Sequence, residues 1–295
     1  MRCETSNEKY KINKVCASFL LLASCFLSAS AQVTYQPDDS VTVCRLLKQA
    51  TPQTTTLWLA RQFLGVPYVA HTLEVNGAEE HLVVNTRQLD CTTLVETVAA
   101  LKLCAQQDKR TWDDFVTMLR KLRYRGGRID GYPSRLHYFS DWIRDKEQMQ
   151  LVSNIDSPNP PFTAVQTLSV SWMSDHPQSY KVLKAHPELL PQIRQQERAL
   201  SGLKVRYIPK RLLNNNELLR QCVRDGDIIV ILTNKRGLDT AHLGFASWHG
   251  DGLHLLNASQ LRKKVVDEPM TLSQYMRQHP TFTGIRVVRL LSANQ

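Results

Sequence analysis

A cysteine at the start of a predicted helix is the residue in this chain best suited to chemistry. Asp90 is a favourable N-cap residue and apolar side chains recur at helical spacing from Leu94 to Leu101, so we predict an amphipathic helix beginning at or just before Cys91. The free N–H groups and dipole at a helix N-terminus favour an anion, which lowers the pKa of a thiol and makes it more nucleophilic. Because a lone cysteine is more often inert core packing, a catalytic role requires a partner histidine.

One of the nine histidines lies where a catalytic base is expected. His242 begins a mostly apolar predicted strand, whereas five of the others lie in polar, loop-like segments. The turn at residues 249–252 predicts a hairpin in which Trp248 lies opposite Leu253. In that register Asn257 lies on the same face as His242, diagonal to it and within side-chain reach. Asn257 can then accept the imidazole N–H and hold the ring toward a thiol.

The elements that carry these residues predict an α+β fold. The sequence of 295 residues is 42% hydrophobic, enough for one large domain with a real core. Besides the helix at Cys91, we predict helical segments over residues 41–64 (as one helix or two pieces), 112–122 and 179–200. In the C-terminal third we predict a sheet with strands at 228–232, 241–248 and 253–258.

Residues 124–142 gather glycine, arginine and aromatic side chains between the predicted helices. Aromatic faces and arginine side chains suit a sugar or a peptide carboxylate, although a buried aromatic cluster with polar caps has the same composition. From this stretch we predict six substrate-binding residues: Arg128, Arg135, His137, Tyr138, Asp141 and Trp142.

The N-terminal residues predict that the protein is secreted across the inner membrane. Three lysines precede an apolar run from Val15 to Leu27, and Ala29-Ser30-Ala31 follows as a small-residue cleavage site, so we predict a secretory signal peptide over residues 1–31. The stretch Leu22-Ala23-Ser24-Cys25 also resembles a lipoprotein box, which would place a lipid anchor on Cys25. We therefore expect a periplasmic protein, soluble or lipid-anchored, with no transmembrane segment, since the apolar run is too short to span a bilayer.

Net charge and missing motifs limit the classes of partner and cofactor that the protein is expected to bind. The formal net charge of +10 suits nucleic acid, anionic lipid or an acidic cell-wall polymer. The chain lacks a long basic run, zinc-finger spacing and an RNA-binding aromatic signature, which argues against nucleic acid. It also lacks C-x-x-C and H-E-x-x-H patterns, so we expect no metal and no cofactor. Four cysteines follow the signal segment, Cys44, Cys91, Cys104 and Cys222, and the sequence leaves their pairing open.

These motifs in order resemble a known group of enzymes. The stretches Gly65-Val66-Pro67-Tyr68, Asp90-Cys91-Thr92-Thr93, Asp225-Gly226-Asp227 and Ala241-His242-Leu243-Gly244 resemble NlpC-type cell-wall peptidases. Within that group, the segments from Asp90 to Glu96 and from Arg135 to Trp142 resemble a family long catalogued as a domain of unknown function. The characterised activity of that family is N-acetylmuramoyl-L-alanine amidase.

The resemblance implies a papain-like fold, in which the nucleophile helix packs on an antiparallel sheet. It implies Cys91 as the nucleophile, His242 as the base and Asn257 as the third polar residue, a position where relatives often carry histidine. Tyr68 matches a tyrosine near the thiol, whose hydroxyl can help the Cys91 N–H bind an oxyanion, although packing over the helix start is the alternative. Glu96 also matches the family motif but can equally pair with an arginine.

The implied function is thiol-dependent hydrolysis of the amide between N-acetylmuramic acid and L-alanine. We expect one catalytic domain over residues 32–295, in which an insertion at about 105–222 walls the cleft and favours small muropeptides over the intact polymer. Two alternatives remain open at this stage. One is a γ-D-glutamyl endopeptidase of the stem peptide on the same fold, and the other is a non-catalytic cell-wall binding protein in which Cys91 is structural or disulfide-bonded.

Overall fold

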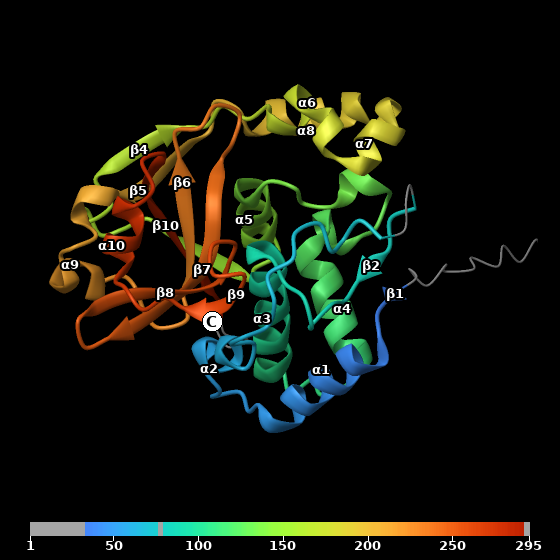
Figure 1. Cartoon of the computed structure of the whole chain (residues 1–295), viewed down its shortest axis with the longest axis horizontal. Helices are drawn as coiled ribbons and strands as arrows, with labels where there is room; N and C mark the ends of the chain where they lie inside the picture. The colour runs from blue at the N-terminus through green and yellow to red at the C-terminus, as the bar shows by residue number, and fades with distance from the viewer. Residues whose placement is uncertain (1–32, 76–78, 292–295) are drawn as a thin grey trace, which may run out of the picture. The chain divides into compact units, whose positions relative to one another are not determined.

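The computed structural model describes residues 33–75 and 79–291 (Figure 1). The predicted signal peptide and the alternative lipid-bearing Cys25 lie outside the described residues. Among the residues it does describe, no helix combines the length and the apolar character needed to cross a membrane.

An antiparallel sheet forms the C-terminal part of the fold, as predicted in outline. Its strand order is β4-β5-β10-β6-β7-β8-β9, and β3 pairs with β10. The strands are β3 Val152–Ile155, β4 Ala164–Thr167, β5 Lys204–Pro209, β6 Ile228–Thr233, β7 Thr240–His249, β8 Gly252–Ser259, β9 Lys264–Asp267 and β10 Phe282–Leu290. A separate parallel pair joins β1 Val33–Thr34 to β2 Leu82–Val83. The three strands predicted at 228–232, 241–248 and 253–258 are confirmed, each within one residue at its ends.

Two of the segments with a helical sequence pattern each form two α-helices. The α-helices are α1 Pro37–Gln49, α2 Thr56–Arg61, α3 Cys91–Gln106, α4 Trp112–Arg123, α5 Phe139–Gln148, α6 Trp172–Asp175, α7 Lys181–Ala185, α8 Leu190–Leu200, α9 Asn216–Arg220 and α10 Leu272–Arg277. The segment at 41–64 is two helices, α1 and α2, which was one of the two forms expected. The helical pattern predicted over 179–200 is confirmed, but as more than one element. It breaks into α7 and α8 because Pro187 excludes His186 from helical geometry.

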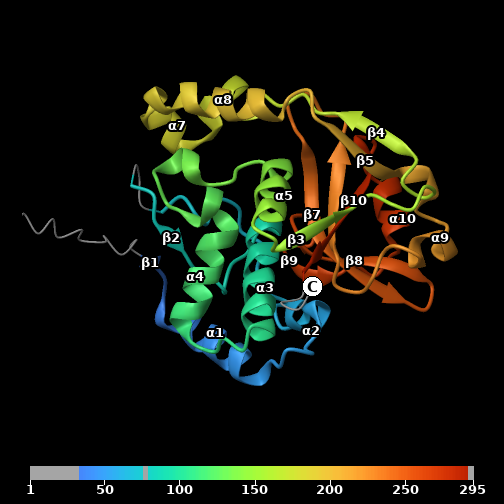
Figure 2. The ribbon, with the colours of Figure 1, turned by 180° about the vertical axis from the view of Figure 1, so that it is seen from behind.

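Both faces of the sheet are covered. Figures 1 and 2 show α3, α4 and α5 on one side of its central strands and α9 and α10 on the other. Alternate residues of β6 divide between the two cores, since Ile228 and Val230 join the α3 side while Ile229 and Ile231 join the α10 side. The fold is therefore a mixed α/β structure built on an antiparallel sheet.

Helix α3 departs from the amphipathic pattern that its sequence predicts. Every residue from Thr93 to Ala105 is buried, so the helix lies inside the protein rather than on its surface. Its two charged side chains are satisfied within the core. Glu96 pairs with Arg123 at 2.6 Å, and Lys102 Nζ donates to the carbonyl oxygens of Pro52 and Thr54 at 2.9 and 2.8 Å.

The long segment between α3 and β6 supplies a third apolar cluster. Tyr132 and Tyr138 pack there with side chains of α6, α7 and α8, including Met173, Leu183 and Ile193. The Tyr138 hydroxyl donates to Glu197 at 2.6 Å and accepts from the backbone N–H of Met173 at 2.9 Å. These contacts attach α6–α8 to the loop that precedes α5.

We expect Gly244→Ala to destabilise the fold, because β7 and β8 approach closely beside His242. A Cβ at Gly244 would lie 2.7 Å from the Leu256 carbonyl oxygen and 2.7 Å from Leu255 Cδ1. The free energy of unfolding, measured by urea denaturation, should fall by about 1–3 kcal/mol. Gly250→Ala is the matched control, since no atom lies within 4 Å of its added Cβ. Equal midpoints for the two variants would contradict this packing.

Candidate active site

The first turn of α3 holds Cys91 at its first helical position. A reciprocal capping box fixes that turn: Thr93 N donates to Asp90 Oδ1 at 2.8 Å, and Asp90 N donates to Thr93 Oγ1 at 2.9 Å. Leu94 N donates to the Asp90 carbonyl oxygen at 3.0 Å. In the part of the chain that the structure describes, no hydrogen bond occupies the Cys91 N–H. That group is free to stabilise an oxyanion at the helix start.

The surroundings of the thiol reverse one expectation from the sequence. Burial, and to a smaller extent the nearby charge of Asp90, raise the pKa of Cys91 to about 12, against hydrogen bonds from Thr92 and the Leu243 backbone. The predicted lowering by the helix N-terminus is therefore wrong, because loss of solvation outweighs the dipole. Cys91 rests as a neutral thiol and needs a base to remove its proton.

His242 and Asn257 meet across the β7–β8 hairpin. Trp248 lies opposite Leu253, as the turn predicts. The Nε2 atom of His242 lies 2.9 Å from Asn257 Oδ1, and since that oxygen only accepts, Nε2 carries the proton. Burial lowers the pKa of His242 below its usual value. The neutral ring keeps an unprotonated Nδ1. The N–H of Leu243, the residue next to His242, contacts Cys91, so the imidazole and the thiol belong to neighbouring parts of the fold.

Tyr68 is held beside the thiol by backbone pairing on both sides. Its N–H donates to the Lys263 carbonyl oxygen at 2.9 Å, next to β9, and it bridges to Leu89 just before the helix cap. Gly65, at φ +85°, allows the turn that leads into this segment. Burial, then the charge that Cys91 carries as a thiolate and the charge of Asp90, raise the pKa of Tyr68 to about 12, so its hydroxyl stays a hydrogen-bond donor at neutral pH.

A cavity of about 540 Å³ opens next to the helix start. On the side of Cys91 it is lined by Tyr68, Asp90, Thr92 and Ala241. Much of the remaining lining comes from the long segment between α3 and β6: Arg123, Tyr132, Arg135, Leu136, His137, Trp172 and Tyr180. The aromatic and arginine side chains therefore face the same space as the residues around the thiol.

Two polar groups on the far wall have no hydrogen-bond partner in the described residues. The Tyr132 hydroxyl and Arg135 Nε are buried and unbonded, although Arg135 Nε lies 3.5 Å from Glu80 and its guanidinium lies 4.8 Å from the Tyr132 ring centre. Buried donors without partners cost free energy, so such groups are typical of sites that a ligand completes.

The six predicted substrate-binding residues lie in four different places. Arg135 and His137 line the cavity, and burial together with Arg135 lowers the pKa of His137 to about 3, so that ring is neutral. Tyr138 and Trp142 belong to the interior, Trp142 because its position in amphipathic α5 faces the core. Asp141 lines a different pocket and Arg128 is exposed away from both.

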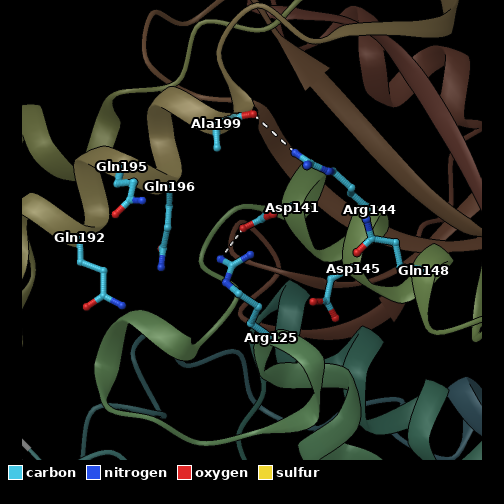
Figure 3. Close-up of a pocket in the computed structure, with 9 residues that line it drawn as sticks. All are labelled: Arg125, Asp141, Arg144, Asp145, Gln148, Gln192, Gln195, Gln196 and Ala199. Atoms are coloured by element: carbon cyan, nitrogen blue, oxygen red, sulfur yellow. Dashed lines mark hydrogen bonds and ion pairs between the residues drawn. The ribbon is translucent and has the colours of Figure 1, made fainter.

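That second pocket, of about 380 Å³, lies between α5 and α8 (Figure 3). Asp141 there accepts a hydrogen bond from Arg125 at 2.6 Å. Gln192 and Gln195 line the pocket from the facing helix, α8. The pocket borders the back of the loop that lines the first cavity, since Gln196 Nε2 donates to the Pro133 carbonyl oxygen at 2.7 Å.

Several residues near the thiol carry no signal that the sequence analysis used. The Tyr275 ring on α10 lies 6.4 Å from the His242 ring, and burial and the charges of Glu268 and Cys91 raise its pKa. Glu268 is buried behind Asn257. Thr271 with Gln274 forms a capping box that would have predicted α10, but its contact with the site depends on the three-dimensional fold.

The four cysteines in the described residues are all free. Cys104 and Cys222 are buried, and Cys44 and Cys91 are partly buried. No disulfide therefore constrains Cys91 in this structure.

Solved structures share this fold over nearly their whole length. One, described as a proposed xylanase from Bacteroides fragilis, is 43% identical with a TM-score of 0.74, covering 79% of this chain and 100% of that one. Another, described as an N-acetylmuramoyl-L-alanine amidase from Bacteroides uniformis ATCC 8492, is 41% identical with a TM-score of 0.75, covering 83% and 99%. A Legionella pneumophila protein matching the family model DUF1460 is 22% identical with a TM-score of 0.67, covering 86% and 95%, and shows the fold alone. None of the curated proteins matches.

Fold, site and neighbours together place the chain in the amidase-like class of hydrolases. The AmiA-like family model, described as N-acetylmuramoyl-L-alanine amidase-like, matches residues 58–285. The chain belongs to this family. The matched range contains Tyr68, Cys91, His242 and Asn257 and extends to the last long strand of the sheet.

We expect the reactivity of Cys91 toward iodoacetamide to rise steeply with pH. Because its pKa is raised to about 12, the thiolate fraction at pH 7 lies below that of an ordinary cysteine, and the rate should grow about tenfold per pH unit from pH 7 to 9. The rate is measured by peptide mapping, with partly buried Cys44 as the internal comparison. A fast, pH-independent rate between pH 5 and 8 would instead show a preformed thiolate–imidazolium pair.

Proposed function

We propose that the protein is a cysteine amidase with an NlpC-type, papain-like fold that hydrolyses the bond between N-acetylmuramic acid and L-alanine in muropeptides. One observation carries the proposal: in an amidase-like family, Cys91 begins a buried helix beside the bonded His242–Asn257 pair. The expected export signal would deliver this enzyme to the periplasm, either soluble or anchored through Cys25.

The first half of the reaction forms a thioester. His242 Nδ1 takes the thiol proton as Cys91 Sγ attacks the lactyl carbonyl carbon, because neither group is charged at rest. The carbonyl oxygen becomes an oxyanion, which the Cys91 N–H and the Tyr68 hydroxyl stabilise. The C–N bond then breaks, and the L-alanine nitrogen leaves with the proton from His242.

The second half restores the enzyme. His242 removes a proton from water, and the oxygen of that water attacks the thioester carbon. The C–S bond breaks, the sugar leaves as its lactyl acid, and the proton on His242 returns to Cys91. Asn257 keeps Nε2 protonated throughout, so Nδ1 exchanges every proton in the cycle.

The cleft supports a small substrate that carries both sugar and peptide. Tyr132, Trp172 and Tyr180 supply aromatic side chains to the lining, which suit the apolar parts of sugar rings. Arg135 Nε and the Tyr132 hydroxyl have no hydrogen-bond partner in the described residues. Because the long segment between α3 and β6 encloses one side of the cavity, fragments should fit better than the cross-linked polymer.

The carboxylates of the cavity favour thiol chemistry over glycosidase chemistry. A glycosidase needs two available carboxyl groups flanking the scissile bond. Of the three acidic side chains that line the cavity, Asp90 caps α3 and Glu96 pairs with Arg123. Among the described residues this leaves Glu74 as the one acidic side chain of the cavity not engaged in this way, and one carboxyl group is too few for that chemistry.

The proposal is tested by mass spectrometry of a purified disaccharide tetrapeptide after incubation with the enzyme. We expect free disaccharide and intact tetrapeptide from wild type and from Cys44→Ala, and no cleavage by Cys91→Ala, since Cys91 is the one of the four described cysteines that lies in the site. A dipeptide left on the sugar would identify a γ-D-glutamyl endopeptidase instead. Absence of cleavage by folded wild type would favour a cell-wall binding protein.

A further inference from the structure

A buried chain of polar contacts continues behind the His242–Asn257 pair. Asn257 Nδ2 donates to Glu268 Oε1 at 3.4 Å and to the Leu255 carbonyl oxygen at 3.3 Å. On its other side, Glu268 Oε2 lies 3.4 Å from Arg262 Nε. Asn257 is 0% exposed and Glu268 is 2% exposed, so water does not screen their contact.

The contact decides which end of the Asn257 side chain faces the imidazole. An amide side chain presents an acceptor on one atom and donors on the other. Glu268 and the Leu255 carbonyl can only accept, so they hold the NH₂ group and leave Oδ1 toward His242. A rotated amide would point its donors at Nε2–H and its acceptor at a carboxylate, which is unfavourable at both ends.

The same carboxylate also supplies a negative charge near His242. His242 becomes an imidazolium when Cys91 attacks, and buried Asn257 carries no charge that could balance it. Glu268 places a negative charge one side chain further away, and that charge favours the protonated form of His242. Arg262, whose side chain is 43% exposed, lies against Glu268 on the solvent side. Its positive charge stabilises the buried carboxylate.

We propose that Glu268 is a positioning residue for His242, acting through Asn257. Its carboxylate fixes the amide that receives the imidazole N–H, and it supports the positive charge that appears on the ring during catalysis. This inference rests on the proposed cysteine amidase mechanism for its catalytic consequence, but the coupling of Glu268 to His242 exists in the resting protein.

Other charged groups also act on His242. Asp90 favours the imidazolium from the start of α3, whereas His279, from the segment after α10, opposes it. Tyr275 on α10 and the Cys91 thiol are neutral at rest, because burial raises the pKa of each. None of these side chains changes in a Glu268 variant, so a shift in the titration of His242 reports the loss of Glu268.

The test measures the imidazole titration by NMR in a Cys91→Ala background and the pH profile of kcat/KM in the Cys91 enzyme. With Glu268→Gln we expect the pKa of His242 to fall by about one unit, since a buried anion beside the ring is lost. The acid limb of kcat/KM should move to lower pH by the same amount, and kcat should fall about tenfold.

Asp227→Asn is the matched control. Asp227 is also a buried carboxylate, 3% exposed, paired with an arginine (Arg289, at 2.7 Å), but it lies at the start of β6 away from the site. Its loss should lower stability and leave the titration of His242 in place. An equal shift in both variants would mean that Glu268 acts only through general stability and would overturn the inference.

Arg262→Gln keeps the test decisive if Glu268→Gln does not fold. This partly exposed side chain can be replaced without opening the core, and removal of its positive charge should raise the pKa of His242. A pKa that stays constant or falls would overturn the proposal. If wild type cleaves no muropeptide while the NMR shifts occur, the coupling stands and the proposed function fails.

Discussion

The burial of α3 from Thr93 to Ala105 is the constraint on which the rest of the structure depends. A helix surrounded by protein cannot rotate or slide without opening the core, so its first residue has one position relative to the sheet. The Asp90–Thr93 box fixes the entry of the chain, and the Glu96–Arg123 pair one turn later satisfies the charge that enters with the helix. Cys91 is therefore placed by packing, not by a flexible loop.

The same burial sets the chemistry at both ends of the proton transfer. Loss of solvation raises the pKa of the thiol and lowers the pKa of His242, so the resting site is a neutral pair. In the proposed mechanism, such a pair is unreactive until a substrate carbonyl arrives, and donors fixed in advance then stabilise the charge that forms. Tyr68 is proposed as one such donor and is anchored between β9 and the residue before the cap.

Local patterns predicted the local structure well. The N-cap at Asp90 and the hairpin that sets Trp248 opposite Leu253 are encoded within a few residues, and both are confirmed. The roles of Cys91, His242, Asn257 and Tyr68 remain predictions, although the structure brings the four residues to one end of α3.

Properties that depend on distant residues could not be predicted. The pKa of Cys91 depends on how deeply α3 is buried, which its own residues do not reveal, because an amphipathic and a fully buried helix share much of the same pattern. Trp142 and Tyr138 were expected to bind substrate because aromatic side chains suit both a core and a binding site. Glu268 contacts Asn257 only because β8 and β9 pair.

The central claim is that Cys91 carries the substrate as a thioester, and intact-protein mass spectrometry after rapid acid quench tests it most directly. With disaccharide tetrapeptide as substrate, the account predicts a transient mass increase equal to the acylating disaccharide, mapped to the peptide that contains Cys91 and absent in Cys91→Ala. An increase that includes two amino acids would retain the thiol chemistry and change the bond. Continued turnover by Cys91→Ala, or an adduct on another residue, would contradict the account.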